Sequence, residues 1–276
     1  MNPILLLASD LDGTLFNSRS EISRENLAAI HELTERGVHF VPSTGRTLGE
    51  LPAELLENSD IRYIIHSNGA VIFDKQTKGR ICNGVKNELL PFVFSVLSRF
   101  QLHLTIRYAG KTYFDAAKNT PEDFQFYNLC KEHIAILKTH AIAKENFVAW
   151  ASTLDDIEQI TSFFHDADEM KEAMRLLSAE PRLRVAISAD YNVEVFSSEA
   201  GKGKALLHLA DLLEIPHQST AAVGDSGNDL TIIRAAGTGF AVSNSCKELM
   251  AAADTVICSN DEHAIRYILT HYFSTQ

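Results

Sequence analysis

Residues 4–14 have the sequence ILLLASDLDGT, an uninterrupted apolar run that leads into two aspartates and a glycine. Apolar residues at successive positions, without alternation, are typical of a strand buried on both faces of a parallel sheet. In an extended segment, residues two positions apart point to the same side, so Asp10 and Asp12 could face one ligand. The segment therefore predicts a buried strand that ends at a polar site.

The segments that follow continue a strand–helix alternation. In the first third, Ser23 is a suitable N-cap and Gly37 a stop for one helix. Further elements are predicted as strands over 38–41 and 63–66 and a helix over 48–56. In the last third, helices are predicted over 204–213, 230–236 and 262–272, and strands over 220–223, 240–242 and 255–257. This succession predicts an α/β fold, a Rossmann-like doubly wound parallel sheet.

The middle of the chain has a different character. It holds most of the aromatic residues and the single tryptophan, Trp150. Patterns there predict helices over 89–100, 155–164 and 170–177, and strands over 103–107, 147–151, 183–187 and 193–196. We therefore predict an α+β domain at 85–190, inserted into a discontinuous core formed by 1–84 and 191–276.

Composition narrows the possible partners. The 276 residues are 45% hydrophobic and 22% charged, which is typical of a globular protein, and the formal net charge is -11. A surface of that sign repels nucleic acid and anionic lipid, so neither is expected as a partner. A phosphate ester would need a local cation to bind.

Cysteine usage and the N-terminal region bear on the compartment. The four cysteines form no C-x-x-C pair, which disfavours structural zinc and a disulfide framework. The apolar run near the start lacks a preceding basic region, so a strand fits it better than a signal peptide. No segment approaches the roughly 20 apolar residues of a membrane span. We expect a cytoplasmic protein, either a monomer or a small homo-oligomer.

Four polar segments fall where chemistry is expected. They are Asp10-Leu11-Asp12-Gly13-Thr14, Ser43-Thr44-Gly45-Arg46, Gly201-Lys202-Gly203 and Gly224-Asp225-Ser226-Gly227-Asn228-Asp229. In a doubly wound sheet, ligands bind at the carboxyl ends of the strands. Three of the segments follow predicted strands and should converge there, and the helix that Gly201-Lys202-Gly203 opens could bring Lys202 to the same edge.

Such a cluster suits a divalent cation and a phosphate. Asp10, Asp225 and Asp229 in one crevice would repel one another, and Mg²⁺ would relieve that repulsion. Lys202 supplies the local cation, and the Thr44 hydroxyl with nearby backbone N–H groups supplies phosphate donors.

The first pair of carboxylates suggests a division of labour. Asp10, at the strand end, is a candidate nucleophile, because Asp carboxylates form acyl phosphates. Asp12 would protonate the leaving oxygen and then activate water.

Each segment also has a simpler explanation. Asp-x-Asp-Gly is often a solvated turn, and Glu21 stands at the twelfth position of a possible calcium loop, although Leu15 replaces the glycine needed at the sixth. Asp225 and Asp229 could be acids at a helix N-terminus, and Lys202 a surface lysine. Arg46 could contact substrate or pair with a structural carboxylate.

Together the segments resemble the signature set of the haloacid dehalogenase superfamily, and their order is similar to that of its Cof-like phosphatases with a C2B cap. The resemblance implies Asp10 as nucleophile, Asp12 as acid/base, and Mg²⁺ held by the Asp10 side chain, the Asp12 carbonyl and Asp225. It places Thr44, Lys202 and Asn228 on the substrate phosphate, with Asp229, Gly45 and Asn68 in support. The inserted domain would then be a mobile cap.

The resulting hypothesis is a Mg²⁺-dependent phosphatase for small phosphorylated metabolites, sugar phosphates first and phosphorylated cofactors next. A phosphomutase on the same scaffold and a non-catalytic metabolite sensor are the alternatives.

Overall fold

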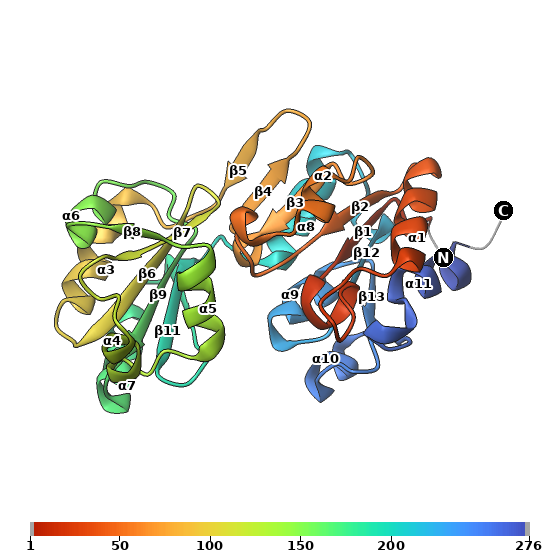
Figure 1. Ribbon diagram of the computed structural model, residues 1–276. Helices are drawn as coiled ribbons and strands as arrows, with labels where there is room; N and C mark the ends of the chain where they lie inside the picture. Colours follow the sequence, from red (N-terminus) through yellow and green to blue (C-terminus); the bar gives the residue numbers. More distant parts are fainter. Residues whose placement is uncertain (1–2, 274–276) are drawn as a thin grey trace. The chain divides into compact units, whose positions relative to one another are not determined.

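The computed structural model describes residues 3–273 and divides the chain into two compact units (Figure 1). The first contains the chain up to Gly45, Pro52–Ile81, and the chain from Gly201 onward. The second contains Arg46–Leu51 and Cys82–Ala200. The predicted α/β class, with a parallel core sheet and an additional α+β unit, is confirmed.

The first unit holds the parallel sheet. Its elements, in chain order, are β1 (Leu6–Ser9), α1 (Arg24–Glu35), β2 (His39–Pro42), α2 (Ala53–Glu57), β3 (Tyr63–His66), β4 (Val71–Asp74), β5 (Arg80–Cys82), α8 (Lys202–Leu212), β12 (Thr220–Gly224), α9 (Leu230–Ala235), β13 (Thr238–Ala241), α10 (Lys247–Ala252), β14 (Thr255–Val256) and α11 (Ala264–Tyr272). The parallel sheet has the order β14-β13-β12-β1-β2, and β3-β4-β5 form a separate sheet in which β3 and β4 are antiparallel.

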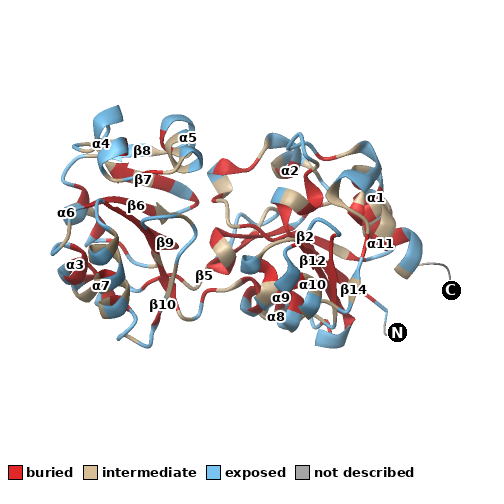
Figure 2. Cartoon of the chain, turned by 90° about the horizontal axis from the view of Figure 1, so that it is seen from below, coloured by how far each residue is buried: buried red, intermediate tan, exposed pale blue. Residues whose placement is uncertain are grey.

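Strand β1 lies inside the sheet because its apolar run is buried on both faces. All four of its residues are buried, and it pairs in parallel with β12 on one side and β2 on the other. Leu6 and Ala8 join an apolar cluster with residues of α8, α9 and α10. Helices α1 and α11 lie on the opposite face of the sheet (Figure 2). The sheet edge that carries the polar segments is therefore held by a core covered on both faces.

Helix α1 shows how local sequence sets the ends of an element. The Ser23 hydroxyl accepts the Asn26 N–H as the N-cap, as predicted. The chain leaves the helix through Gly37, whose φ is +78°. Its buried stripe includes Ala29, Ile30 and Leu33.

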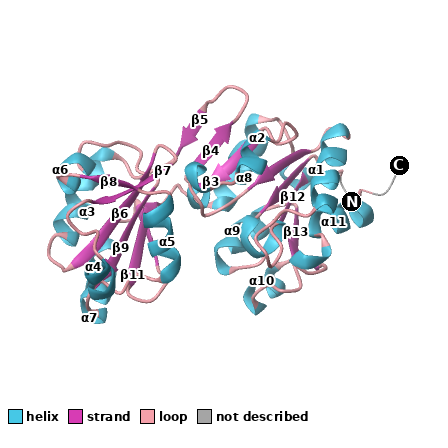
Figure 3. Ribbon diagram, in the orientation of Figure 1, coloured by secondary structure: helices cyan, strands magenta, loops and turns pink. Residues whose placement is uncertain are grey.

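The second unit is built on a mainly antiparallel sheet of order β10-β11-β9-β6-β7-β8 (Figure 3). Its elements are α3 (Leu90–Leu97), β6 (Leu102–Tyr108), β7 (Lys111–Asp115), α4 (Pro121–Phe126), α5 (Lys131–Thr139), β8 (Ile142–Lys144), α6 (Phe147–Ala151), β9 (Gln159–Phe164), α7 (Ala167–Leu177), β10 (Leu183–Ala186) and β11 (Asn192–Ser197).

The two faces of this sheet differ in chemistry. Strand β6 turns Leu102, Leu104 and Ile106 to an apolar core shared with α3 and α7. Its alternate residues are polar, and they include two buried side chains, His103 and Thr105. A smaller apolar cluster with residues of α4 and α5 covers part of this second face.

The unit boundaries differ from those expected at 84/85 and 190/191. Strand β11 belongs to the second unit because it pairs with both β9 and β10. Residues Arg46–Leu51 also group with the second unit, although they follow β2 directly.

Two elements predicted in the middle of the chain are wrong. Residues 155–164 were predicted as a helix, but Gln159–Phe164 is a fully buried strand between β6 and β11. Residues 147–151 were predicted as a strand but form helix α6, whose buried residues are Phe147 and Ala151, four apart. In both places the apolar run is short, and its neighbours in the fold decide between the two periodicities.

The helix predicted over 48–56 is also wrong in extent. The chain forms a short 3₁₀ turn at Leu48–Glu50 and then the separate helix α2. Pro52, the N-cap of α2, explains the break, because a proline ring disfavours helical conformation in the residue before it.

Over residues 3–273, no helix is long and apolar enough to cross a membrane.

His103 should make the second unit sensitive to acid. Burial lowers the pKa of His103 to about 4, and its Nε2–H donates to the Lys118 carbonyl at 3.1 Å. A histidine whose pKa is lowered on folding contributes stability above pH 6.5 that is lost as pH falls toward its folded pKa. Between about pH 7 and about pH 4.5, wild-type protein should lose about 2 kcal/mol more unfolding free energy than H103F. Urea unfolding followed by circular dichroism measures this, and equal losses would contradict it.

Candidate active site

Three segments distant in sequence meet at the carboxyl edge of the parallel sheet. Asp10 follows β1 and Asp225 follows the adjacent strand β12, and the Asp10 N–H donates to the Val223 carbonyl at 3.0 Å. Lys202 is the first residue of α8. The first unit alone therefore brings together the aspartates and the lysine predicted to meet.

Lys202 forms the central contact of the site. Its Nζ lies 2.6 Å from Asp10 Oδ1 and 2.6 Å from Asp229 Oδ1. The lysine side chain is 1% exposed, and those of Asp10 and Asp229 are 7% and 0% exposed. Burial alone would lower the pKa of Lys202, but the two carboxylates outweigh it and raise that pKa above its usual value. The lysine is therefore a permanent cation.

Asp229 is committed to holding the loop. Its Oδ2 accepts the backbone N–H groups of Asp225 and Ser226, each at 3.2 Å, while its Oδ1 accepts from Lys202. These three hydrogen bonds hold the carboxylate in one position. Asp229 therefore fixes the turn that presents Asp225.

The remaining acids are not fully neutralised. Burial raises the pKa of Asp10 to about 7, because repulsion by Asp229 and Asp225 adds to desolvation and Lys202 offsets only part. Burial and repulsion by Asp229 raise the pKa of Asp225 to about 6, with a further contribution from Asp12. The site thus holds more negative charge than its one lysine balances.

These carboxylates fit a hard divalent cation. Ligand oxygens of Asp10, Asp225 and Asp229 lie within 4.8 Å of one another. Because Asp229 already accepts three hydrogen bonds, Asp10 and Asp225 are the better ligand candidates. An all-oxygen set with unbalanced negative charge suits Mg²⁺, which binds one or two carboxylates.

The turn after Asp10 needs a glycine. Residues Leu11–Leu15 form a turn with non-helical backbone angles at Asp12 and Gly13, closed by the Phe16 N–H, which donates to the Leu11 carbonyl at 2.8 Å, and Gly13 has φ +77°. A Cβ on Gly13 would lie 2.6 Å from Asp225 Oδ2, so the backbone approaches the carboxylate more closely than a side chain would allow.

Two residues that tie this turn were not predicted. The Thr14 hydroxyl donates to Asp225 Oδ1 at 3.3 Å, and Asn244 Nδ2 donates to the Gly13 carbonyl at 2.8 Å. Thr14 belongs to the Asp-x-Asp-Gly-Thr segment and could have been found there. Asn244 stands in no motif.

The predicted phosphate-binding turn follows β2. Thr44 is buried, its N–H donates to the Ile65 carbonyl at 2.9 Å, and its carbonyl accepts the Asn68 N–H at 3.0 Å. Gly45 lies against the Asn68 side chain, since a Cβ there would be 2.9 Å from Asn68 Oδ1. Asn68 itself has the left-handed φ of +54°. Thr44 is thus hydrogen-bonded to Asn68, and Gly45 packs against the same residue.

Two predicted residues lie at the periphery. Asp12 is exposed, at the start of the Gly13 turn, and is close enough to raise the pKa of Asp225. Asn228 is also exposed, and its Oδ1 accepts the Ser226 hydroxyl at 2.7 Å. Asn228 therefore contacts its own loop, whereas Lys202 contacts the aspartates directly.

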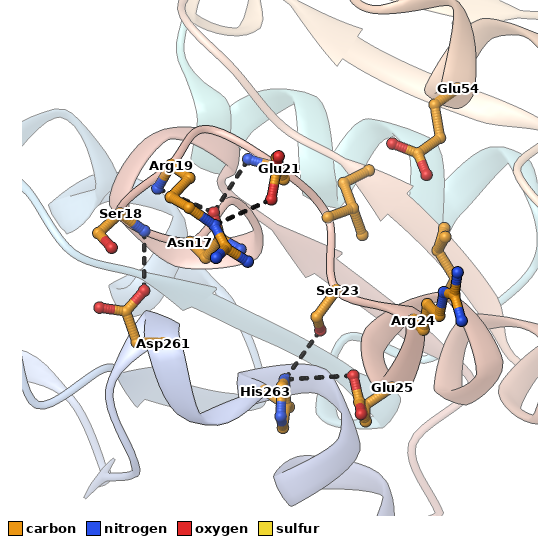
Figure 4. Close-up of a pocket in the computed structure, with 12 residues that line it drawn as sticks. Asn17, Ser18, Arg19, Glu21, Ser23, Arg24, Glu25, Glu54, Asp261 and His263 are labelled. Atoms are coloured by element: carbon orange, nitrogen blue, oxygen red, sulfur yellow. Dashed lines mark hydrogen bonds and ion pairs between the residues drawn. The ribbon is translucent and has the colours of Figure 1, made fainter.

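The chain that follows the Gly13 turn, from Asn17 onward, borders a pocket lined by both acidic and basic side chains (Figure 4). Asp261 Oδ1 accepts the Ser18 N–H at 2.8 Å, and His263 Nδ1 lies 2.9 Å from the Ser23 hydroxyl. These contacts fasten the segment that follows Asp10 and Asp12 to the end of the first unit.

Comparison with known proteins gives one family over nearly the whole chain. The family model for haloacid dehalogenase-like hydrolases matches residues 7–269. Phosphatase YwpJ of Bacillus subtilis is 29% identical, with 96% of this chain and 99% of that protein covered. The 5-amino-6-(5-phospho-D-ribitylamino)uracil phosphatase YwtE of Bacillus subtilis is 30% identical, with 98% of each covered.

Solved structures agree with this. A haloacid dehalogenase-like hydrolase from B. subtilis superposes with a TM-score of 0.76 at 27% identity, over 98% of this chain and 100% of that one.

Removing the central cation should destabilise the protein strongly. K202M leaves two buried carboxylates without their partner, which typically costs about 3–5 kcal/mol. The matched control is K204M, which replaces an exposed lysine two residues further along α8. It should change the free energy of unfolding by less than about 0.5 kcal/mol. Urea denaturation of both variants measures the difference, and equal stability would contradict the central role of Lys202.

Proposed function

The chain belongs to the haloacid dehalogenase-like hydrolase family and is a phosphatase, and we propose that it passes the phosphoryl group of a small metabolite to Asp10 and then to water. The observation that carries this proposal is the position of Asp10. Its carboxylate lies at the end of a buried strand, in contact with a buried, permanently charged lysine.

In the first step, an Asp10 carboxylate oxygen attacks phosphorus and the bond from phosphorus to the leaving oxygen breaks. Asp12 gives a proton to that oxygen, and the product alcohol departs. In the second step, water attacks phosphorus while Asp12 accepts its proton, and the bond to Asp10 breaks to release inorganic phosphate. Exposure of Asp12 suits a group that exchanges protons with solvent.

The residues around Asp10 have supporting roles in this proposal. Lys202, the Thr44 hydroxyl and Asn228 would bind the phosphate oxygens, and Asp229, Gly45 and Asn68 would hold those groups in place. Lys202 can bind the phosphate while it orients Asp10, because it already contacts that carboxylate.

Mg²⁺ would be held by the Asp10 side chain, the Asp12 carbonyl and Asp225. When bound, it would neutralise negative charge on the phosphoryl group. The unbalanced charge of Asp10 and Asp225 supports this assignment.

The substrate class rests on the relatives. The relative YwtE is named for a phosphate on a ribityl chain, and this chain matches it over nearly its full length. We propose sugar phosphates and phosphorylated cofactors or their precursors as the substrates of this chain.

Phosphate release from a panel of these compounds tests the proposal. Wild-type protein with Mg²⁺ should hydrolyse at least one class, and chelation of the metal should abolish release. The rate of phosphate release by D10N should be lower than that of wild-type protein by about three orders of magnitude or more, with the variant still folded, because the substitution removes the nucleophile. Substantial activity in D10N would exclude Asp10 as the nucleophile.

The same panel separates the alternative functions. Phosphoryl transfer to a second sugar hydroxyl without phosphate release would identify a mutase, and no reaction with any compound would identify a sensor.

Metal binding should depend on pH in a defined direction. Without metal, Asp10 and Asp225 keep protons up to about pH 7 and about pH 6. Because the folded state then binds more protons than the unfolded state, these two groups lower stability as pH rises through that window. Mg²⁺ displaces the protons, so it should raise the melting temperature more at about pH 8 than at about pH 5.5.

Thermal unfolding with and without Mg²⁺ measures this dependence. D225N should lose most of the metal-induced rise, whereas D211N, which changes an exposed carboxylate of α8, should keep it. A rise that is the same at both pH values would contradict the assignment of Asp10 and Asp225 to the metal.

A further inference from the structure

The segment Arg46–Leu51 changes units twice within a few residues. The chain up to Gly45 and the chain from Pro52 both belong to the first unit, but the six residues between them belong to the second. This excursion directly follows Thr44 and Gly45, the turn proposed to bind the phosphate.

A buried carboxylate fastens this segment. Glu50 has a side chain that is 4% exposed, its Oε1 accepts the Thr112 hydroxyl at 2.7 Å, and its Oε2 accepts the Thr47 N–H at 3.0 Å. Arg107 Nη2 lies 3.8 Å from Oε2. Burial alone would raise the pKa of Glu50, but Arg107 and these hydrogen bonds outweigh it and lower that pKa. Glu50 is therefore a charged, fully engaged anchor on β6 and β7.

Backbone contacts add to the anchor. The Gly49 N–H donates to the Gly110 carbonyl at 2.8 Å, and the Gly110 N–H donates to Glu158 Oε1 at 2.7 Å. Both Gly110 and Glu158 are buried residues of the second unit. The segment is thus fixed by its backbone as well as by a side chain.

The other end of the segment is fixed in the first unit. Thr44 is hydrogen-bonded to Ile65 and Asn68, and Gly45 packs on Asn68. Thr47 is already bonded to Glu50. Only Arg46 separates the residue held by the first unit from the residue held by the second.

We propose that Arg46–Leu51 is a tether that couples the phosphate-binding turn to the second unit, with Glu50 as its positioning residue. This inference rests on the proposed function, because it takes Thr44 and Gly45 as phosphate ligands. With the anchor intact, the turn is held in one conformation before phosphate arrives. With the anchor broken, binding must also order the turn, and affinity falls.

Two matched threonines test the tether. Thr112 and Thr105 are buried to the same extent, 3% exposed, and their side chains lie on one face of the second sheet. T112V removes the hydroxyl that Glu50 accepts, whereas T105V removes a hydroxyl that lies 3.5 Å from His133 Nε2 and does not touch the tether. Loss of a hydrogen bond to a charged group should weaken binding of inorganic phosphate by about five- to tenfold in T112V, and by less than twofold in T105V.

The measurement is titration of each Mg²⁺-loaded protein with inorganic phosphate by calorimetry, together with KM and kcat on the best substrate. T112V should raise KM by a similar factor with a smaller change in kcat. E50Q keeps the acceptor for Thr112 and should retain more phosphate affinity than E50A. Equal phosphate affinity in T112V and T105V, both verified as folded, would overturn the tether. Phosphate binding is read without turnover, so wild-type protein that binds phosphate but hydrolyses nothing would refute the proposed function and leave the tether standing.

Discussion

The buried contact of Lys202 with Asp10 and Asp229 is the constraint on which the rest of the site depends. A charged lysine side chain that is 1% exposed is tolerated only because two carboxylates contact its ammonium group, and this requires α8 to begin beside the ends of β1 and β12. Helix α8 can sit there because residue 203 is a glycine: a Cβ would lie 2.3 Å from the Thr231 carbonyl of α9. The packing of α8 against α9 therefore also determines where the charge of Lys202 lies in the site.

The same contact leaves the site with more carboxylates than the single lysine can neutralise. Asp229 accepts three hydrogen bonds, whereas burial, with repulsion between the carboxylates added to it, raises the pKa of Asp10 and the pKa of Asp225. A divalent metal ion would supply positive charge for these two carboxylates, and together with Lys202 it would balance the negative charge of a substrate phosphate. In the proposed tether at Arg46–Leu51 another buried carboxylate, that of Glu50, holds the stretch of chain that follows the turn proposed to bind phosphate.

The sequence predicted those parts of the structure in which the local residue pattern is compatible with a single conformation. The apolar run before Asp10 could only be a buried strand, and the polar segments had to meet once the strands were parallel. Prediction failed where tertiary contacts decide. Residues 159–164 are a strand because β6 and β11 flank them, and 147–151 are a helix because only Phe147 and Ala151 are buried. Asn244 and Glu50 each form a hydrogen bond with a residue far away in the chain, and no local sequence pattern predicts such contacts.

The central claim is that Asp10 carries the phosphoryl group. The most direct measurement is mass spectrometry of peptides from protein quenched in acid during turnover, using D12N, in which the second step should be slow because the group that activates water is gone. The account predicts one phosphoryl group on the peptide that contains Asp10, and none when D10N is added to D12N. A phosphoryl group on another residue, or none on a variant that still releases phosphate, would contradict it.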